Sequence, residues 1–141
     1  MDSLNRTDEA RAISKGSEDV AEASGVIKQT AETLTAGEKI IQALDLADAE
    51  RAAMSEYEAQ RSHTRSGEGA VLQPPPKNPI LAALGVEPEV YVLNVVQKVQ
   101  STALHDALLV LPFGNVVSLM TYLDIWAQKV VSAVLLGGAW N

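Results

Sequence analysis

The chain has 141 residues, of which 47% are hydrophobic and 21% are charged, and its formal net charge is -7. This length suits one ordinary domain and excludes a two-domain enzyme. The absence of cysteine excludes a disulfide scaffold, a thiolate zinc site and a cysteine nucleophile. Direct nucleic-acid binding is not expected of an acidic chain, because affinity for phosphate backbones comes from Lys and Arg.

Most of the charge lies in the first half of the chain. Residues 1–70 carry 14 acidic and 8 basic residues, whereas residues 71–141 carry 4 and 3. Residues 1–29 are rich in Ala, Ser, Glu and Asp and lack aromatic residues. Such a segment cannot bury enough apolar surface to offset its chain entropy. We therefore expect a disordered acidic arm over residues 1–29, with transient helix.

The following segment predicts an amphipathic helix over residues 30–61. Thr35 and Glu38 have the spacing of a capping box near its start. The apolar stripe is narrow and the other faces are charged, so we expect this helix to lie on a larger unit or on another helix. The stripe recurs at helical spacing and consists of Ile40, Leu44, Ala47, Met54 and Tyr57.

Residues 62–79 pass from a Gly/Ser stretch into three consecutive prolines, which predicts a linker that ends stiff and extended. A short apolar turn over 80–84 stops at Gly85. Pro88 then opens a predicted helix over 88–100, since proline suits the first helical position. The β-branched residues of this segment also suit a strand, and that alternative stays open here.

Two more helices complete the second half. Ser101 or Thr102 is expected to cap a helix over 103–110, and Pro112 is expected to end it. Asn115 is expected to cap a last helix from residue 116 to at least 129. The predicted fold class is therefore all-α, with a long N-terminal amphipathic helix, a linker, and a short stacked helical array over residues 80–129. The longest run without charge, residues 107–123, is too short and too polar to span a membrane.

Few residues are candidates for catalysis or metal binding. His105 stands next to Asp106, but neighbouring residues on a helix do not face each other, and a small hydrolase built on this pair lacks a nucleophile. His63 lies in the linker, where nothing would position it for catalysis. We interpret the acidic residues of the first helix as a solvated face rather than as metal ligands: Asp45 with Asp48, and Glu56 with Glu58. No catalytic residue, metal ligand or cofactor is predicted.

Residues 106–126 carry the most specific string, in which DALLVLPF is followed by Gly114 and then by NVVSLMTYLDIW. This string resembles the C-terminal helical domain of WD-repeat scaffold proteins of the small-subunit processome, in which an ALLVLPF helix end leads into an LLxYLxEW helix. Further blocks at residues 37–44, 78–81 and 91–93 match in the same order. The resemblance covers residues 30–129.

The resemblance implies a non-enzymatic scaffold of the nucleus and nucleolus, within the UTP-B subcomplex of the particle that matures the small ribosomal subunit on pre-ribosomal RNA. It implies partners among the C-terminal helical domains of sister UTP-B subunits, with only indirect contact to small nucleolar RNA and none to a membrane. A generic helical protein-binding adaptor is the alternative. The expected contact residues serve packing or the interface, which the pattern does not separate: Val92, Val96, Leu108, Leu111, Phe113, Leu119, Leu123 and Trp126.

The sequence departs from this pattern at Gly114, where the family often has serine, and at Ile125, which replaces an acidic residue. After Lys129 the match is lost. We therefore expect a divergent apolar tail over residues 130–141 and interpret the chain as a fragmentary gene product, with a non-functional product as one alternative and membrane association through the tail as a weaker one. An open apolar face would leave the isolated chain marginally stable and prone to dimerise or aggregate.

Overall fold

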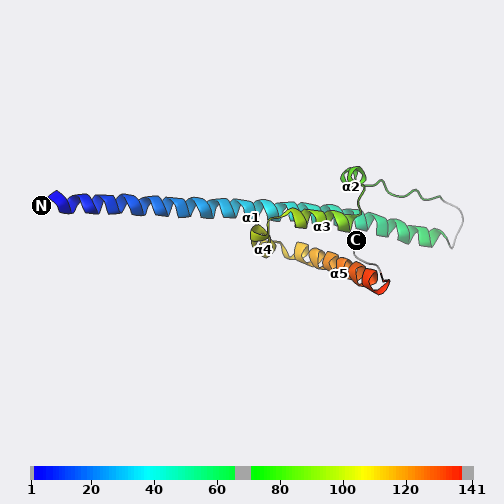
Figure 1. Cartoon of the computed structure of the whole chain (residues 1–141). Coiled ribbons are helices and arrows are strands. Elements are labelled where there is room, and N and C mark those ends of the chain that lie inside the picture. Colours follow the sequence, from blue (N-terminus) through cyan, green and yellow to red (C-terminus); the bar gives the residue numbers. More distant parts are fainter. Residues whose placement is uncertain (1, 66–70, 138–141) are drawn as a thin grey trace.

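The computed structural model describes residues 2–65 and 71–137, with the side chains of residues 30–65 and 71–137. Within these ranges the secondary structure is helical, without a strand, so the predicted all-α class is confirmed. The helices are α1 (Asp2–Thr64), α2 (Pro79–Leu84), α3 (Pro88–Lys98), α4 (Ser101–Leu109) and α5 (Phe113–Leu135). Figure 1 shows α1 as a long rod, with α3, α4 and α5 gathered beside its middle and later parts.

The long helix α1 extends further than the sequence predicted. Residues 2–29, expected to form a disordered arm, have helical backbone that continues into the predicted helix. The first proline stands at position 74, so no residue up to Thr64 removes a backbone donor from the helix. The predicted capping box is wrong, because Thr35 lies inside α1 and its hydroxyl donates to the Ala31 carbonyl at 2.9 Å. The backbone amides there already have partners within the helix.

The short helix α2 forms where the sequence predicted an apolar turn, and an asparagine and a glycine set its two ends. The Asn78 side chain accepts from the Ile80 backbone N–H at 2.9 Å and caps its first turn. Gly85 ends α2 with a φ of 65°, a conformation that favours glycine, and its N–H donates to the Leu81 carbonyl at 2.8 Å.

The chain between α1 and α2 returns to α1. The Asn78 backbone N–H donates to the Glu50 carboxylate at 3.3 Å, and the Tyr57 hydroxyl lies 3.5 Å from the Leu72 carbonyl. Residues 71–78 have no regular secondary structure, in keeping with three consecutive prolines. Residues 66–70 of the predicted linker lie outside the described residues.

The starts of the later helices both confirm and correct the sequence predictions. Pro88 opens α3, and the segment is a helix rather than a strand. Neither Ser101 nor Thr102 caps α4, whose cap residue is Gln100 and carries no side-chain cap bond. The predicted Asn115 cap is also wrong, since α5 begins at Phe113, three residues before the predicted start, and its cap residue is Pro112. The Pro112 carbonyl accepts from the Val116 N–H at 3.0 Å and so starts the first turn.

The core lies where α3, α4 and α5 pack on the middle of α1. Ile40 and Leu44 are fully buried on one face of α1, one helical turn apart, and Val92 of α3 and Tyr122 of α5 are fully buried opposite them. The remaining members of this cluster are four alanines and one leucine: Ala36, Ala47, Ala103, Ala107 and Leu111. Within the described ranges, no helix combines the length and the apolar character needed to cross a bilayer.

Candidate functional site: a helix-packing interface

Small residues allow α4 to approach α1 closely. A side-chain carbon added at Gly37 would meet the Val110 side chain at 3.4 Å and the Ala107 carbonyl at 3.8 Å, which are ordinary contact distances. Ala36 and Ala47 extend the same buried face of α1. Because contacts between close-packed helices depend on side-chain volume, this face favours one arrangement of its neighbours.

A polar ladder ties α5 to α1. Asp48 of α1 accepts from the Ser118 hydroxyl at 2.5 Å and from the Tyr122 hydroxyl at 2.7 Å. One turn away on both helices, the Asn115 amide donates to Asp45 at 3.1 Å. These bonds fix both the rotation and the register of α5, because each needs a specific pair of positions to face each other.

Tyr122 is the centre of this contact. Its side chain is fully buried, and the Arg51 guanidinium lies 5.3 Å from the centre of its ring, within cation–π range. Burial raises the pKa of the Tyr122 phenol well above its usual value, and the hydrogen bond to the Asp48 carboxylate raises it further. The phenol therefore stays a donor to Asp48 at neutral pH.

A second polar contact joins α5 to α3. The Trp126 indole N–H donates to the Glu89 backbone carbonyl at 3.0 Å, and the Lys129 ammonium lies 2.7 Å from the Glu89 carboxylate. Burial raises the pKa of Glu89, but the hydrogen bond from Lys129, a backbone hydrogen bond and the charges of Lys129 and Arg51 outweigh it. The net pKa lies below its usual value. Glu89 is thus held ionised as an anchor for α5.

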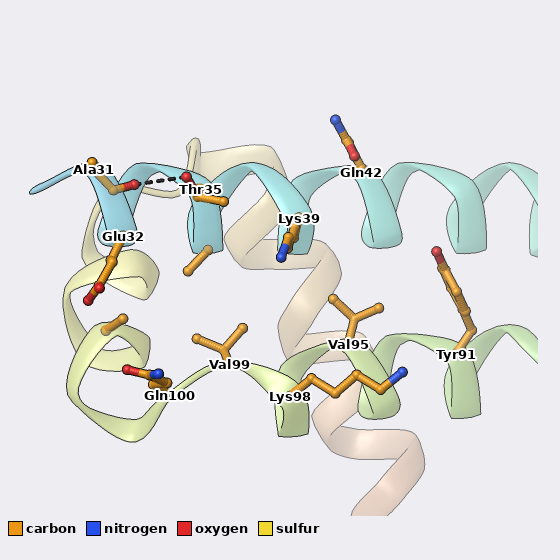
Figure 2. Close-up of a pocket in the computed structure, with 12 residues that line it drawn as sticks. Ala31, Glu32, Thr35, Lys39, Gln42, Tyr91, Val95, Lys98, Val99 and Gln100 are labelled. Carbon is orange, nitrogen blue, oxygen red and sulfur yellow. Dashed lines mark hydrogen bonds between the residues drawn. The ribbon is translucent and has the colours of Figure 1, made fainter. Parts of the chain in front are cut away.

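A groove of about 640 Å³ lies between α1 and α3. Figure 2 shows Val95 of α3 and Val99, the residue after α3, pointing across the groove toward α1, with the Lys39 side chain extending into it from α1. Apart from the half-buried Tyr91, the polar residues of its lining are exposed: Glu32, Thr35, Lys39, Gln42, Lys98 and Gln100. The groove thus offers no enclosed polar group of the kind that catalysis requires.

The structure separates the eight predicted packing or interface residues into two groups. Val92 and Leu111 are buried, and four more are half-buried against the core: Val96, Leu108, Leu119 and Trp126. Phe113 and Leu123 are exposed by 83% and 46% of their surface. The exposed pair lies on α5, on the side that no other described helix covers.

Both histidines lie on the surface, and one of them contacts its neighbouring acid. The His105 imidazole lies 3.3 Å from the Asp106 carboxylate, so these neighbours do contact each other, contrary to our expectation. The His105 side chain is nevertheless 80% exposed, and His63 is exposed as well. An exposed imidazole beside an exposed carboxylate has no enclosed space in which to hold a substrate.

Asp48 differs from its prediction, since it is half-buried and bonded to α5 instead of lying on a solvated face, whereas Asp45 is exposed as predicted and also bonds Asn115 of α5. Among the described residues, no three His, Asp or Glu side chains come together in a way that could hold a metal ion. Sequence reasoning missed the partners Ser118 and Tyr122. The signal that could have revealed them is a matched pair of polar stripes, with acids three residues apart on α1 and hydroxyls four residues apart on α5.

No protein-family model matches the chain. U3 small nucleolar RNA-associated protein 12 of Saccharomyces cerevisiae is 36% identical to it over 123 residues, which are 85% of this chain. WD repeat-containing protein 3 of Mus musculus is 37% identical over 110 residues, or 77% of the chain, and its Dictyostelium discoideum homolog is 32% identical over 72%. The chain is similar to a part of each of these proteins.

The aligned segment is only a small part of each relative's length. The chain spans 13% of the length of the yeast protein, 11% of the mouse protein and 10% of the Dictyostelium protein. The resemblance that the sequence motifs indicated is confirmed by these matches.

Proposed function

We propose that the chain acts as a non-enzymatic protein-interaction segment of the small-subunit processome in the nucleolus, where it supports pre-rRNA processing and assembly of the small ribosomal subunit. One observation carries this proposal, namely 36% identity over 85% of the chain to a protein named for its association with U3 small nucleolar RNA. The alignment is long relative to the chain, unlike a match to a single short motif.

The geometry supports an interaction role. The polar groups of α5 that face α1 and α3 are used in packing, and the exposed side of the same helix is apolar. Exposed apolar patches that span several turns of a helix mark surfaces for binding other proteins. The groove beside α3 has exposed polar side chains and no enclosed reactive group.

The charge supports contact with proteins rather than with RNA. The net charge is -7, with 11 Lys and Arg residues against 18 Asp and Glu. Such a chain lacks the cluster of cations that binds phosphate backbones. We propose that it reaches the pre-ribosomal particle through the helical domains of sister UTP-B subunits.

The proposal is tested by expressing the tagged chain in cells and purifying it from a nucleolar extract. We expect enrichment of UTP-B subunits by mass spectrometry and of U3 small nucleolar RNA by reverse-transcription PCR. A Leu44→Asp variant serves as the disrupted control, because it places an unpaired charge in the core, and Glu56→Gln serves as the matched surface control. A wild-type chain that folds and localises but enriches neither would contradict the proposal and favour a generic helical adaptor.

A further inference from the structure

Seven residues of α5 form an exposed row along the side of the helix that faces away from α1. They recur at alternating intervals of four and three residues. We call this row the outward seam, and it consists of Phe113, Val117, Met120, Asp124, Ala127, Val131 and Val134. The exposed fractions are 83% for Phe113, 62% for Met120 and 61% for Val134, so the apolar character is on the surface along the whole helix.

The spacing of the outward seam is that of a helix that packs against another helix. Apolar residues that alternate by three and four positions form the contact row of coiled coils, in which each side chain fits between side chains of the facing helix. Tyr122 points to α1 on the opposite side of α5, so the seam is separate from the core contact. The seam runs for six helical turns, long enough for a specific helix pairing.

Asp124 occupies the middle of the outward seam and is its only charged member. Its carboxylate accepts from the Gln128 amide at 2.9 Å, and among the described residues no cation forms an ion pair with it. A purely apolar helix laid over the seam would bury this carboxylate without an opposite charge, which is costly. A facing Lys or Arg removes that cost.

The central position of Asp124 also acts against a second copy of the chain. Three seam residues precede it and three follow it, so a parallel pairing in register brings the two Asp124 carboxylates together. A symmetric antiparallel pairing does the same. Like charges directly opposite each other are destabilising in a helix interface, and a single polar residue in the contact row selects among partners.

A lipid surface fits the seam less well. Helices that lie in a membrane interface carry several Lys or Arg residues beside the apolar face. Over its described length α5 carries one, Lys129, and this cation is engaged with Glu89 on α3. An acidic residue in the middle of the apolar row would have to enter the lipid boundary.

We propose that the outward seam of α5 binds an amphipathic helix of another protein, which presents apolar residues at the same spacing and a Lys or Arg opposite Asp124. The inference rests on the interaction role proposed above and adds to it the surface and the chemistry of the partner. It does not depend on ribosome assembly.

The experiment uses the full chain and a charge-reversed copy of it as the basic partner. An Asp124→Lys variant keeps the apolar seam and reverses its central charge. In equal mixtures with the wild-type chain, analytical ultracentrifugation is expected to show a mixed dimer at least tenfold tighter than the self-association of either chain alone. Raising the salt concentration should weaken the mixed dimer, because the added attraction is between charges. Circular dichroism melting confirms that both chains are folded.

Two variants make the result specific. Glu56→Lys reverses a charge at an exposed position of α1 and is expected to leave association with the wild-type chain at its self-association level. Asp124→Asn removes the seam charge without reversing it and is expected to strengthen self-association several-fold. A mixed dimer no tighter than the self-pairs, or an equal gain with Glu56→Lys, overturns the proposal.

The other outcomes separate the alternatives. Flotation of the wild-type chain with phosphatidylcholine and phosphatidylserine vesicles, lost when Met120 and Val131 become serine, would replace the helix partner with a lipid surface and overturn the proposal. The purified mixture contains no pre-ribosomal component. Failure to enrich U3 small nucleolar RNA together with a tight mixed dimer would therefore remove the ribosomal assignment and keep the seam.

Discussion

One face of α5 packs against α1 and α3 and the other faces solvent, although both faces are rich in apolar side chains. The packed face contains the fully buried Tyr122, and its polar side chains donate hydrogen bonds to Asp48, Asp45 and the Glu89 carbonyl. The outward seam contains one charge, Asp124, with no ion-pair partner among the described residues. The polar groups of the packed face already have partners within the chain. A charge without an ion-pair partner on an apolar face indicates that a binding partner must supply the opposite charge.

Truncation of the central residue of the packed face should have the largest effect. Tyr122→Ala removes a fully buried ring and leaves Asp48 with one partner fewer, so we expect a loss of about 3–5 kcal/mol in the free energy of unfolding. Met120→Ala on the outward seam is the matched control, and its cost should stay within about 0.5 kcal/mol. Urea titrations followed by circular dichroism measure both. Equal losses would show that the two faces do not differ as described.

The hydroxyl alone tests the polar ladder. Tyr122→Phe keeps the ring and removes the donor to the half-buried Asp48, for which we expect a loss of about 1–3 kcal/mol. Tyr57→Phe is the control, because the Tyr57 hydroxyl reaches the Leu72 carbonyl at 3.5 Å, too long for a strong bond. Its loss should be under about 0.5 kcal/mol. A Tyr122→Phe variant as stable as the wild-type chain would contradict the role of the ladder in holding α5.

The raised pKa of Tyr122 predicts a loss of stability in alkali. The unfolded phenol ionises near its usual value of about 10, whereas the folded phenol keeps its proton to higher pH. The stabilisation is therefore complete below pH 10 and falls as the pH rises toward the folded pKa, since the unfolded state then releases a proton that the folded state retains. Melting temperatures between pH 8 and 11 measure this fall. The Tyr122→Phe variant should show a shallower fall, and a parallel one would refute the assignment to Tyr122.

The smallest effect is expected at the ion pair between Lys129 and Glu89. Lys129→Met should lower the free energy of unfolding by about 0.5–1 kcal/mol at pH 7, because Lys129 is half exposed and solvent screens the pair. Glu89 has a lowered pKa in the folded state, so its contribution is present above about pH 4.3 and disappears as the pH falls through the folded pKa. Wild type and variant should therefore converge in stability in acid. A difference that persists unchanged at pH 3 would contradict an ionic origin.

Local patterns in the sequence predicted the helices, because the residues that start and end a helix act locally. Pro88 at the start of α3, Gly85 at the end of α2 and the proline between α4 and α5 act on their immediate neighbours. The β-branched residues of α3 made a strand possible, and burial of Val92 against α1 decided for the helix. Tertiary packing thus resolved an ambiguity that local propensity left open.

The errors have a common cause in contacts between distant residues. Asn115 was predicted as a cap and Asp48 as a solvated acid, yet each has its partner about 70 residues away, across the contact between α1 and α5. Thr35 was predicted at a helix start because the continuation of α1 before residue 30 has no strong apolar pattern. Spacing within one segment cannot show which acid on α1 meets which hydroxyl on α5. The two-faced nature of α5 became visible only once the packed face was known.

The claim that the outward seam binds partners while the opposite face holds the fold is tested most directly by one double variant. Met120→Lys combined with Val131→Lys places two charges on the seam and leaves the contacts of Tyr122 and Trp126 with α1 and α3 in place. The measurement is the recovery of UTP-B subunits with the tagged variant, quantified by mass spectrometry against the wild-type chain. We predict an unchanged melting temperature and at least a tenfold loss of recovered subunits. Full recovery with an unchanged melting temperature would contradict the account.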